Sequence, residues 1–273
     1  MTRLALLMLV LVAPARAEPL TPPDASHTFV RSDQASKSRA PYNTADVTYV
    51  VSKDLQGAAA ADAKKVVAHI AALRTPFPVY LGRVHAARFA AEPAYREKVT
   101  QLATLITQAT GVRCLFSLED AAGPGAHTIP AWLAPELQEL ARHATLALAC
   151  HCDARMTRAD VHARVADLHD HYGDTLKIPL HQLFVDVDLA QPAASPAFDR
   201  VVGWALEEAY AAHFGGFHTA GTIKKSALTA ADSTYRALDE AWNHLAAAHP
   251  DQAFAGLRPA KPTFPKPPSA SPH

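Results

Sequence analysis

Residues 183–189 read Leu-Phe-Val-Asp-Val-Asp-Leu, and this stretch is the key to the fold class. Its first three residues are apolar without a break, as in a strand that is covered on both faces. Five more short apolar runs, each expected to form a strand, lie at 47–51, 79–84, 112–118, 146–152 and 217–220. The six runs begin 32 to 37 residues apart, which is close to the length of one βα unit.

The segments between these runs have the period of amphipathic helices and recognisable helix ends. Thr157 and Asp160 have the spacing of a capping box, Ser195 is placed to cap another helix, and Gly111 is placed to end a third. The sequence therefore predicts an α/β fold of repeated βα units with a mainly parallel sheet. Six units are visible whereas a complete barrel has eight, so we expect either a (β/α)-barrel-like sheet, complete or incomplete, or an open doubly wound sheet.

The first 17 residues have the layout of a secretory signal peptide. Met1-Thr2-Arg3 provides a positive start, residues 4–13 are an unbroken apolar run, and Ala15-Arg16-Ala17 matches a signal-peptidase site. The apolar run has ten residues, half of the roughly 20 that span a bilayer. We therefore expect export without a membrane span, and a periplasmic or secreted protein.

Composition divides the rest of the chain into three parts. Residues 18–44 are rich in Pro and Ser and lack periodicity, which predicts a flexible leader. Residues 45–257 hold all the apolar runs and are expected to form a single α/β domain. Residues 258–273 contain six prolines and are expected to be a disordered tail.

The charge balance and the missing motifs exclude several classes of protein. The chain has 26 basic and 26 acidic residues, and a net charge of zero argues against binding to nucleic acid. The sequence has no Walker loop, no Gly-x-Gly-x-x-Gly after a strand and no Gly-x-Ser-x-Gly elbow. These absences disfavour nucleotide and dinucleotide enzymes and the usual serine esterases.

The three cysteines are Cys114, Cys150 and Cys152, an odd number, so they allow one intramolecular bridge. In an exported protein, a disulfide from Cys114 to either of the other two is geometrically reasonable and would leave one buried thiol. The alternative is a Cys-His-Cys metal site, but His151 points away from the strand face that Cys150 and Cys152 share.

Ionisable residues follow the strands, and in both expected architectures ligands bind at the carboxyl ends of the strands. Asp186 and Asp188 share one strand face directly after an apolar core, where a carboxylate is costly unless it is paired or hydrogen-bonded. Glu119 lies at the equivalent level of another strand and could form a carboxylate pair with Asp186. Asp186 could instead meet an arginine such as Arg83 or Arg155. The residues expected to contact a substrate are Arg83, His151 and Asp188.

The same edge of the sheet could bind a divalent metal ion. Histidine and aspartate are sensible ligands for such an ion, although these residues come from separate strands and have no defining spacing. The candidate ligands are His85, His151, Asp153, Asp186 and His218.

Residues 117–190 resemble secreted (β/α)-barrel glycosidases of the polygalactosaminidase and spherulin type. In those families a Gly-Pro-Gly loop follows one strand, as Gly123-Pro124-Gly125 does here, and an Arg-containing loop follows another, similar to 148–155. A helix then leads to a strand with a Phe-x-Asp core, similar to Phe184-Val185-Asp186. The resemblance implies a barrel, glycosidase activity and an acidic active-site residue at Asp186.

Three hypotheses follow for the function. The first is an exported hydrolase that acts on a glycan through Asp186 and Glu119, with no cofactor. The second is a hydrolase that depends on a divalent metal held by the histidine and aspartate set. The third is a non-catalytic binding protein of the periplasm or cell surface. Carbohydrate or another small molecule is the expected ligand.

Overall fold

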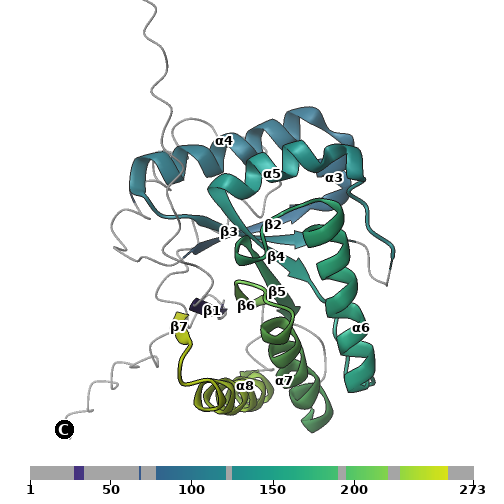
Figure 1. Cartoon of the computed structure of the whole chain (residues 1–273), viewed down its shortest axis with the longest axis vertical. Coiled ribbons are helices and arrows are strands. Elements are labelled where there is room, and N and C mark those ends of the chain that lie inside the picture. The colour runs from purple at the N-terminus through teal and green to yellow at the C-terminus, as the bar shows by residue number, and fades with distance from the viewer. Residues whose placement is uncertain are drawn as a thin grey trace, which may run out of the picture.

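A computed structural model describes residues 28–33, 68, 78–120, 125–189, 195–220 and 228–257 (Figure 1). Within these residues the fold is α/β, with one seven-stranded parallel sheet in the order β2-β3-β4-β5-β6-β1-β7. The strands are β1 (Thr28–Asp33), β2 (Val79–His85), β3 (Cys114–Glu119), β4 (Ala144–Ala149), β5 (Leu183–Asp188), β6 (Gly216–Ala220) and β7 (Ala253–Leu257). The helices are α3 (Ala86–Ala91), α4 (Pro93–Thr110), α5 (Ala134–His143), α6 (Arg158–Leu168), α7 (Pro196–Ala211) and α8 (Leu228–Ala248).

Five of the six expected strands are confirmed as β2 to β6, which pair in chain order. The apolar run at 47–51 lies outside the described residues. The largest shift is in β4, which runs from Ala144 to Ala149, so Cys150 and Cys152 follow the strand rather than belong to it. The parallel order of β2 to β6 agrees with repeated βα units.

The prediction of a flexible leader over 18–44 is wrong at residues 28–33, which form β1 between β6 and β7. The central residue of β1 is Arg31, which is buried and forms ion pairs with Asp33 and with Asp239 of α8, both at 2.7 Å. Arg31 interrupts the apolar pattern of this short run, and its partner Asp239 is more than 200 residues away in the sequence. The local sequence pattern therefore did not indicate a strand.

The helix signals are confirmed where they depend on local chemistry. Thr157 and Asp160 form a complete capping box at the start of α6, and Ser195 accepts a hydrogen bond from the backbone N–H of Phe198 in α7. Gly111 ends α4 with a φ of 70°, a left-handed conformation that favours glycine. Beyond α6 the chain continues as a π-helical segment, His169–Thr175.

The two faces of the sheet are packed differently, and this decides between the two expected architectures. Side chains on one face, such as Phe116 and Val185, join the apolar side chains of α4 to α8 in one large core. The opposite face, which we call the inner face, has a small separate cluster of Leu115, Ala147 and Phe184. The described helices lie against one face only, so the described part of the fold is barrel-like. Figure 1 shows these helices around the sheet, with α4 and α5 above the strands, α6 beside them and α7 and α8 below.

Two further expectations concern membranes and disulfides. Among the described helices, none combines the length and the apolar composition needed to cross a bilayer. Cys114, Cys150 and Cys152 are all buried free thiols, so the disulfide expected from Cys114 does not form in this structure. Cys114 belongs to the core between the sheet and the helices, where burial raises the pKa of its thiol.

Candidate active site on the inner face of the sheet

Alternation along the strands brings a set of ionisable and hydroxyl side chains to the inner face. In each strand the residues two apart share a face, so the residues that follow the inner apolar cluster also lie on this side. The register pairs Arg83 with Ser117, His85 with Glu119, and Asp186 with His218. His218 is the central residue of β6, and the others lie in the carboxyl-terminal halves of their strands or at the strand ends, where ligands bind in parallel α/β sheets.

Asp186 is the most buried carboxylate of this set and is 3% exposed. The hydroxyl of Ser117 donates a hydrogen bond to its Oδ2 atom, although β4 separates the two strands in the sheet. The inner face of β4 carries Ala147 and Ala149, whose small side chains leave room for this contact. A buried carboxylate requires such a donor because burial otherwise removes the hydrogen bonds that water supplied.

Arg83 joins two further carboxylates at the mouth of the site. Its guanidinium donates to Oδ2 of Asp188 at 3.0 Å and lies 3.8 Å from Oε1 of Glu119. The other oxygen of Glu119 lies 3.0 Å from Nδ1 of His85. These side chains are each about two-fifths exposed, so Glu119 can meet a ligand from solvent while Asp186 forms the floor.

Burial and nearby charged groups shift the pKa values of Arg83 and Tyr80. Burial opposes the charge of Arg83, but Asp188, Tyr80 and Glu119 outweigh this effect and raise the pKa of the guanidinium. Burial, followed by the charge of Asp186, raises the pKa of Tyr80 above its usual range. Arg83 therefore remains a cation and Tyr80 a neutral phenol, two donors beside the carboxylates.

His218 is the most deeply buried ionisable group of the site. It is fully buried, and its ring stacks on that of Tyr80 with centroids 4.8 Å apart. Burial lowers the pKa of His218 to about 3, an effect that the backbone of Ser32 opposes weakly. Within the described residues neither ring nitrogen has a partner at full hydrogen-bond geometry. His218 is therefore a neutral imidazole at physiological pH.

The structure brings four of the five residues of the leading prediction together, and His151 is the exception. Asp186, Glu119, Arg83 and Asp188 all lie on the inner face, as expected. Nε2 of His151, however, lies 3.0 Å from the backbone oxygen of Asp120, so its ring is turned towards the loop after β3. The backbone φ of His151 is 50°, which breaks the alternation that placed it on the inner face.

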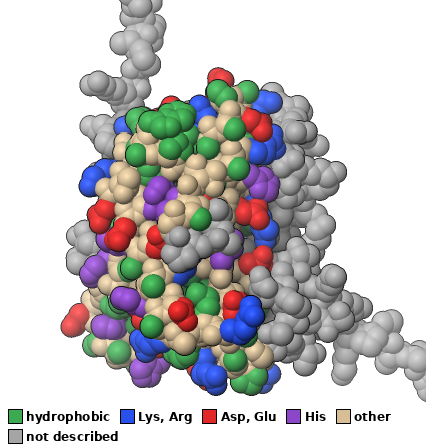
Figure 2. All heavy atoms as spheres, turned by 90° about the vertical axis from the view of Figure 1, so that its right-hand side faces the viewer, with side chains coloured by type: hydrophobic (Ala, Val, Ile, Leu, Met, Phe, Trp, Pro, Cys, Tyr) green, Lys and Arg blue, Asp and Glu red, His purple; other side chains and the backbone are tan. Residues whose placement is uncertain are grey.

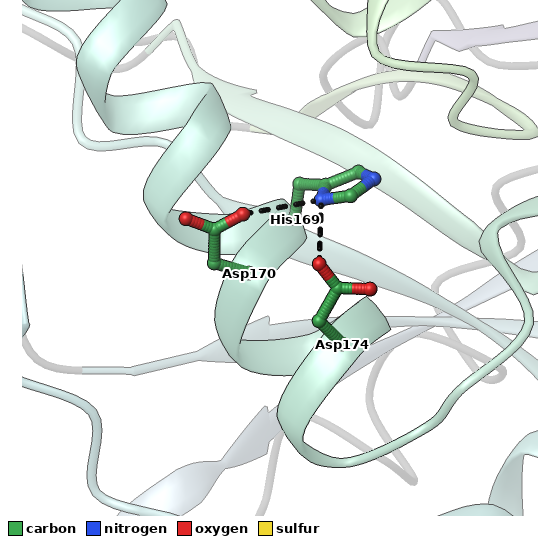
Figure 3. Close-up of side chains that lie close together, drawn as sticks. All are labelled: His169, Asp170 and Asp174. Carbon is green, nitrogen blue, oxygen red and sulfur yellow. Dashed lines mark hydrogen bonds and ion pairs between the residues drawn. The ribbon is translucent and has the colours of Figure 1, made fainter.

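The alternative metal set does not converge in the described structure. His85 lies beside Glu119, His151 beside the backbone of Asp120, and Asp153 beside Arg155. Among the described residues, the one group of three candidate ligand atoms within 4.8 Å of one another is His169, Asp170 and Asp174 (Figure 3). This group belongs to the π-helical segment, and its two carboxylates are exposed.

Sequence reasoning missed Ser117 as a member of the site, whereas Tyr80 was one of four aromatic residues, with Trp132, Trp204 and Tyr210, that could contact a sugar. Ser117 belongs to an otherwise apolar run, so it does not stand out by type. The signal that could have identified Ser117 is its position two residues before Glu119, which places both on one strand face. Tyr80 lies below Arg83 on β2, beyond a register shift at Gly82 that plain alternation does not anticipate.

A second buried polar cluster lies after β3 on the helix side. Asp120 accepts hydrogen bonds from the hydroxyl of Tyr172 at 2.5 Å and from the backbone N–H of Thr128 at 2.9 Å, and it also lies 3.3 Å from Nδ1 of His127. His127 in turn stacks on His171 with centroids 3.9 Å apart. These contacts hold the loop after β3 against the end of α6, which is a structural role.

No protein-family model matches the chain, and a search of the curated proteins finds no significant match.

The molecular surface agrees with the charge balance of the sequence. On the face in Figure 2, which is the right-hand side of Figure 1, acidic and basic side chains are interspersed, with histidines between them. This face has no uniform basic patch of the kind that binds a phosphate backbone.

Proposed function

We propose that this protein is an exported hydrolase that acts on a glycan through the carboxyl groups of Asp186 and Glu119. The observation that carries the proposal is the contrast between these two groups on one face of the sheet. Asp186 is buried and held by Ser117, whereas Glu119 is half-exposed between Arg83 and His85. Export is part of the proposal and rests on the layout of residues 1–17.

Two carboxyl groups with different surroundings suit the hydrolysis of a glycosidic bond. One protonates the leaving oxygen, while the other either adds to the anomeric carbon or activates water. Ser117 fixes the rotamer of Asp186, and Arg83 with His85 fixes that of Glu119, so both groups are preorganised.

The remaining groups of the site suit a polar, hydroxyl-rich ligand. The phenol of Tyr80 and the guanidinium of Arg83 are donors, and Asp188 is an acceptor beside them. Such a mixture of donors and acceptors matches the hydroxyl groups of a sugar. In this proposal Arg83 and Asp188 orient the substrate, and the acid and base work belongs to Asp186 and Glu119.

The test is hydrolysis of a panel of glycans by the wild-type protein and by Asp186→Asn and Glu119→Gln. Each variant is expected to lose about 10²- to 10⁴-fold in kcat/KM, because each removes one acid–base group. Glu139→Gln is the matched control, since Glu139 is an exposed residue of α5 paired with Arg142. Full activity of Asp186→Asn, or a wild-type protein that hydrolyses no glycan of the panel, would overturn the proposal.

The leaving group distinguishes the roles of the two carboxyl groups. A nitrophenyl leaving group departs without protonation, so loss of the general acid is expected to matter much less on a nitrophenyl glycoside than on a natural glycan. Loss of the nucleophile or base lowers both rates. A variant pair with the same loss on both substrates would contradict the division of roles.

A further inference from the structure

Two thiols lie side by side where β4 leaves the sheet. The Sγ atom of Cys152 is 3.3 Å from that of Cys150, and both side chains are buried. The third cysteine, Cys114, is also buried but makes no sulfur contact within the described residues. The pair is anchored to the site, because the backbone N–H of Cys150 donates to the carbonyl oxygen of Asp186 at 2.8 Å.

The backbone between the thiols is bent so that their side chains meet. An extended chain advances at most about 3.6 Å per residue, so the Cα atoms of two residues separated by one other lie at most about 7.2 Å apart. The positive φ of His151, 50°, bends the chain and shortens this distance towards the range of about 4.4–6.8 Å that a disulfide needs. The ring of His151 points to Asp120 and leaves the two sulfur atoms facing each other.

The surroundings of the pair determine when it can react. The hydrogen bond with Cys150, followed by burial, raises the pKa of Cys152 well above its ordinary value, while the nearby guanidinium of Arg164 opposes this effect. Because the thiolate is the reactive form, the folded pair is slow to exchange with thiols or disulfides in solution. Oxidation of the two thiols to a disulfide is therefore expected while the chain folds, when both thiols are still accessible to solvent.

We propose that Cys150 and Cys152 close to a disulfide when the chain folds in an oxidising compartment. The two thiols lose two protons and two electrons to a low-molecular-weight disulfide such as oxidised glutathione. One sulfur–sulfur bond forms in the protein, one breaks in the oxidant, and the oxidant leaves as two thiols. The bridge fixes the turn beside Asp186. This proposal rests on export of the chain but not on the reaction proposed for the site.

The test uses the full chain, unfolded, reduced and refolded in a buffer of oxidised and reduced glutathione. The refolded protein is then unfolded in acidic guanidinium and alkylated at its free thiols. One of the three cysteines is expected to react, and all three are expected to react after treatment with a phosphine reductant. Alkylation of all three without the reductant would overturn the proposal.

Single variants identify which cysteines form the bridge. Cys114→Ser is expected to leave no free thiol after oxidative refolding, whereas Cys150→Ser and Cys152→Ser each leave two. A peptide map of the wild-type protein should show the segment with both cysteines lighter by two hydrogen atoms. A bridge that includes Cys114 would also overturn the proposal, and neither result depends on whether the protein hydrolyses a glycan.

Discussion

The two faces of the sheet contain the same strands but carry different chemistry. Phe116 and Ser117 are neighbours on β3, and both are buried. Phe116 joins the large apolar core under the helices, whereas Ser117 donates a hydrogen bond to Asp186 on the inner face. A one-residue step along the chain therefore separates a side chain that stabilises the fold from one that positions a carboxyl group.

This difference separates the apolar burial that stabilises the fold from the polar groups of the inner face. The core under the helices includes or contacts side chains from every described strand and every described helix, so it accounts for most of the apolar burial. The inner face has a small apolar floor and above it buried polar groups such as Asp186 and His218. Buried polar groups contribute little net stability, so their retention there agrees with a functional role.

The largest expected effect comes from truncation on the helix side. Phe116→Ala removes a fully buried ring and is expected to lower the free energy of unfolding by about 3–5 kcal/mol. The matched change on the inner face, Ser117→Ala, removes one donor and is expected to cost about 1–3 kcal/mol. Urea unfolding of both variants measures the difference, and equal losses would contradict the division between the two faces.

A second effect tests how tightly the apolar cluster of the inner face is packed. A Cβ atom at Gly216 would lie 2.2 Å from the carbonyl oxygen of Val30 and 2.7 Å from the ring of Phe184. Gly216→Ala is therefore expected to lower the free energy of unfolding by about 1–3 kcal/mol, since the backbone of β1 must move.

The control for this change is Gly203→Ala in α7. A Cβ atom there would meet Ala241 at 3.6 Å, an ordinary contact, and alanine is the better helix former. We expect this variant to gain about 0.5–1 kcal/mol. Thermal unfolding of the two alanine variants should shift in opposite directions; a tolerated Gly216→Ala would show that the inner face is loosely packed.

The third effect is the pH dependence that His218 adds. Its pKa is about 3 in the folded protein and about 6.5 in an unfolded chain, so between these values the unfolded state binds the additional proton. Stability from this group is therefore complete above about pH 6.5 and decreases by about 1.4 kcal/mol per pH unit as the pH falls towards 3.

Comparison of the wild-type protein with His218→Gln isolates this contribution. The difference in their free energies of unfolding should shrink as the pH is lowered from 7 to 4. His162→Gln is the control for the loss of a histidine, because His162 is exposed on α6. Parallel loss of stability in the wild-type protein and His218→Gln would contradict a neutral, buried imidazole.

The sequence predicted what depends on short-range pattern. The apolar runs predicted five of the strands, and the capping box at Thr157 and the glycine at Gly111 marked real helix ends. Alternation also placed Asp186 and Asp188 on one face, because the side-chain period of a strand follows from its backbone geometry alone, and Glu119 was expected at the same level of another strand.

The failures come from features that short-range sequence patterns do not show. β1 was missed because Arg31 is neutralised by Asp239 of α8, a partner that no local pattern reveals. The position of His151 was wrong because the chain leaves the strand at Ala149 and turns at a residue with positive φ. The disulfide expected from Cys114 does not form either, because the sulfur atom beside Cys150 is that of Cys152, at 3.3 Å.

The sequence by itself determined the α/β class, the repeating units and the edge of the sheet where polar groups gather. These properties follow from periodicity, capping and the polarity of strand ends, which act over a few residues. The tertiary structure alone decided that the helices cover one face, that Ser117 reaches Asp186 past two alanines, and that His218 is buried as a neutral ring. Burial and pairing depend on which distant segments meet, and this is settled by packing of the whole chain.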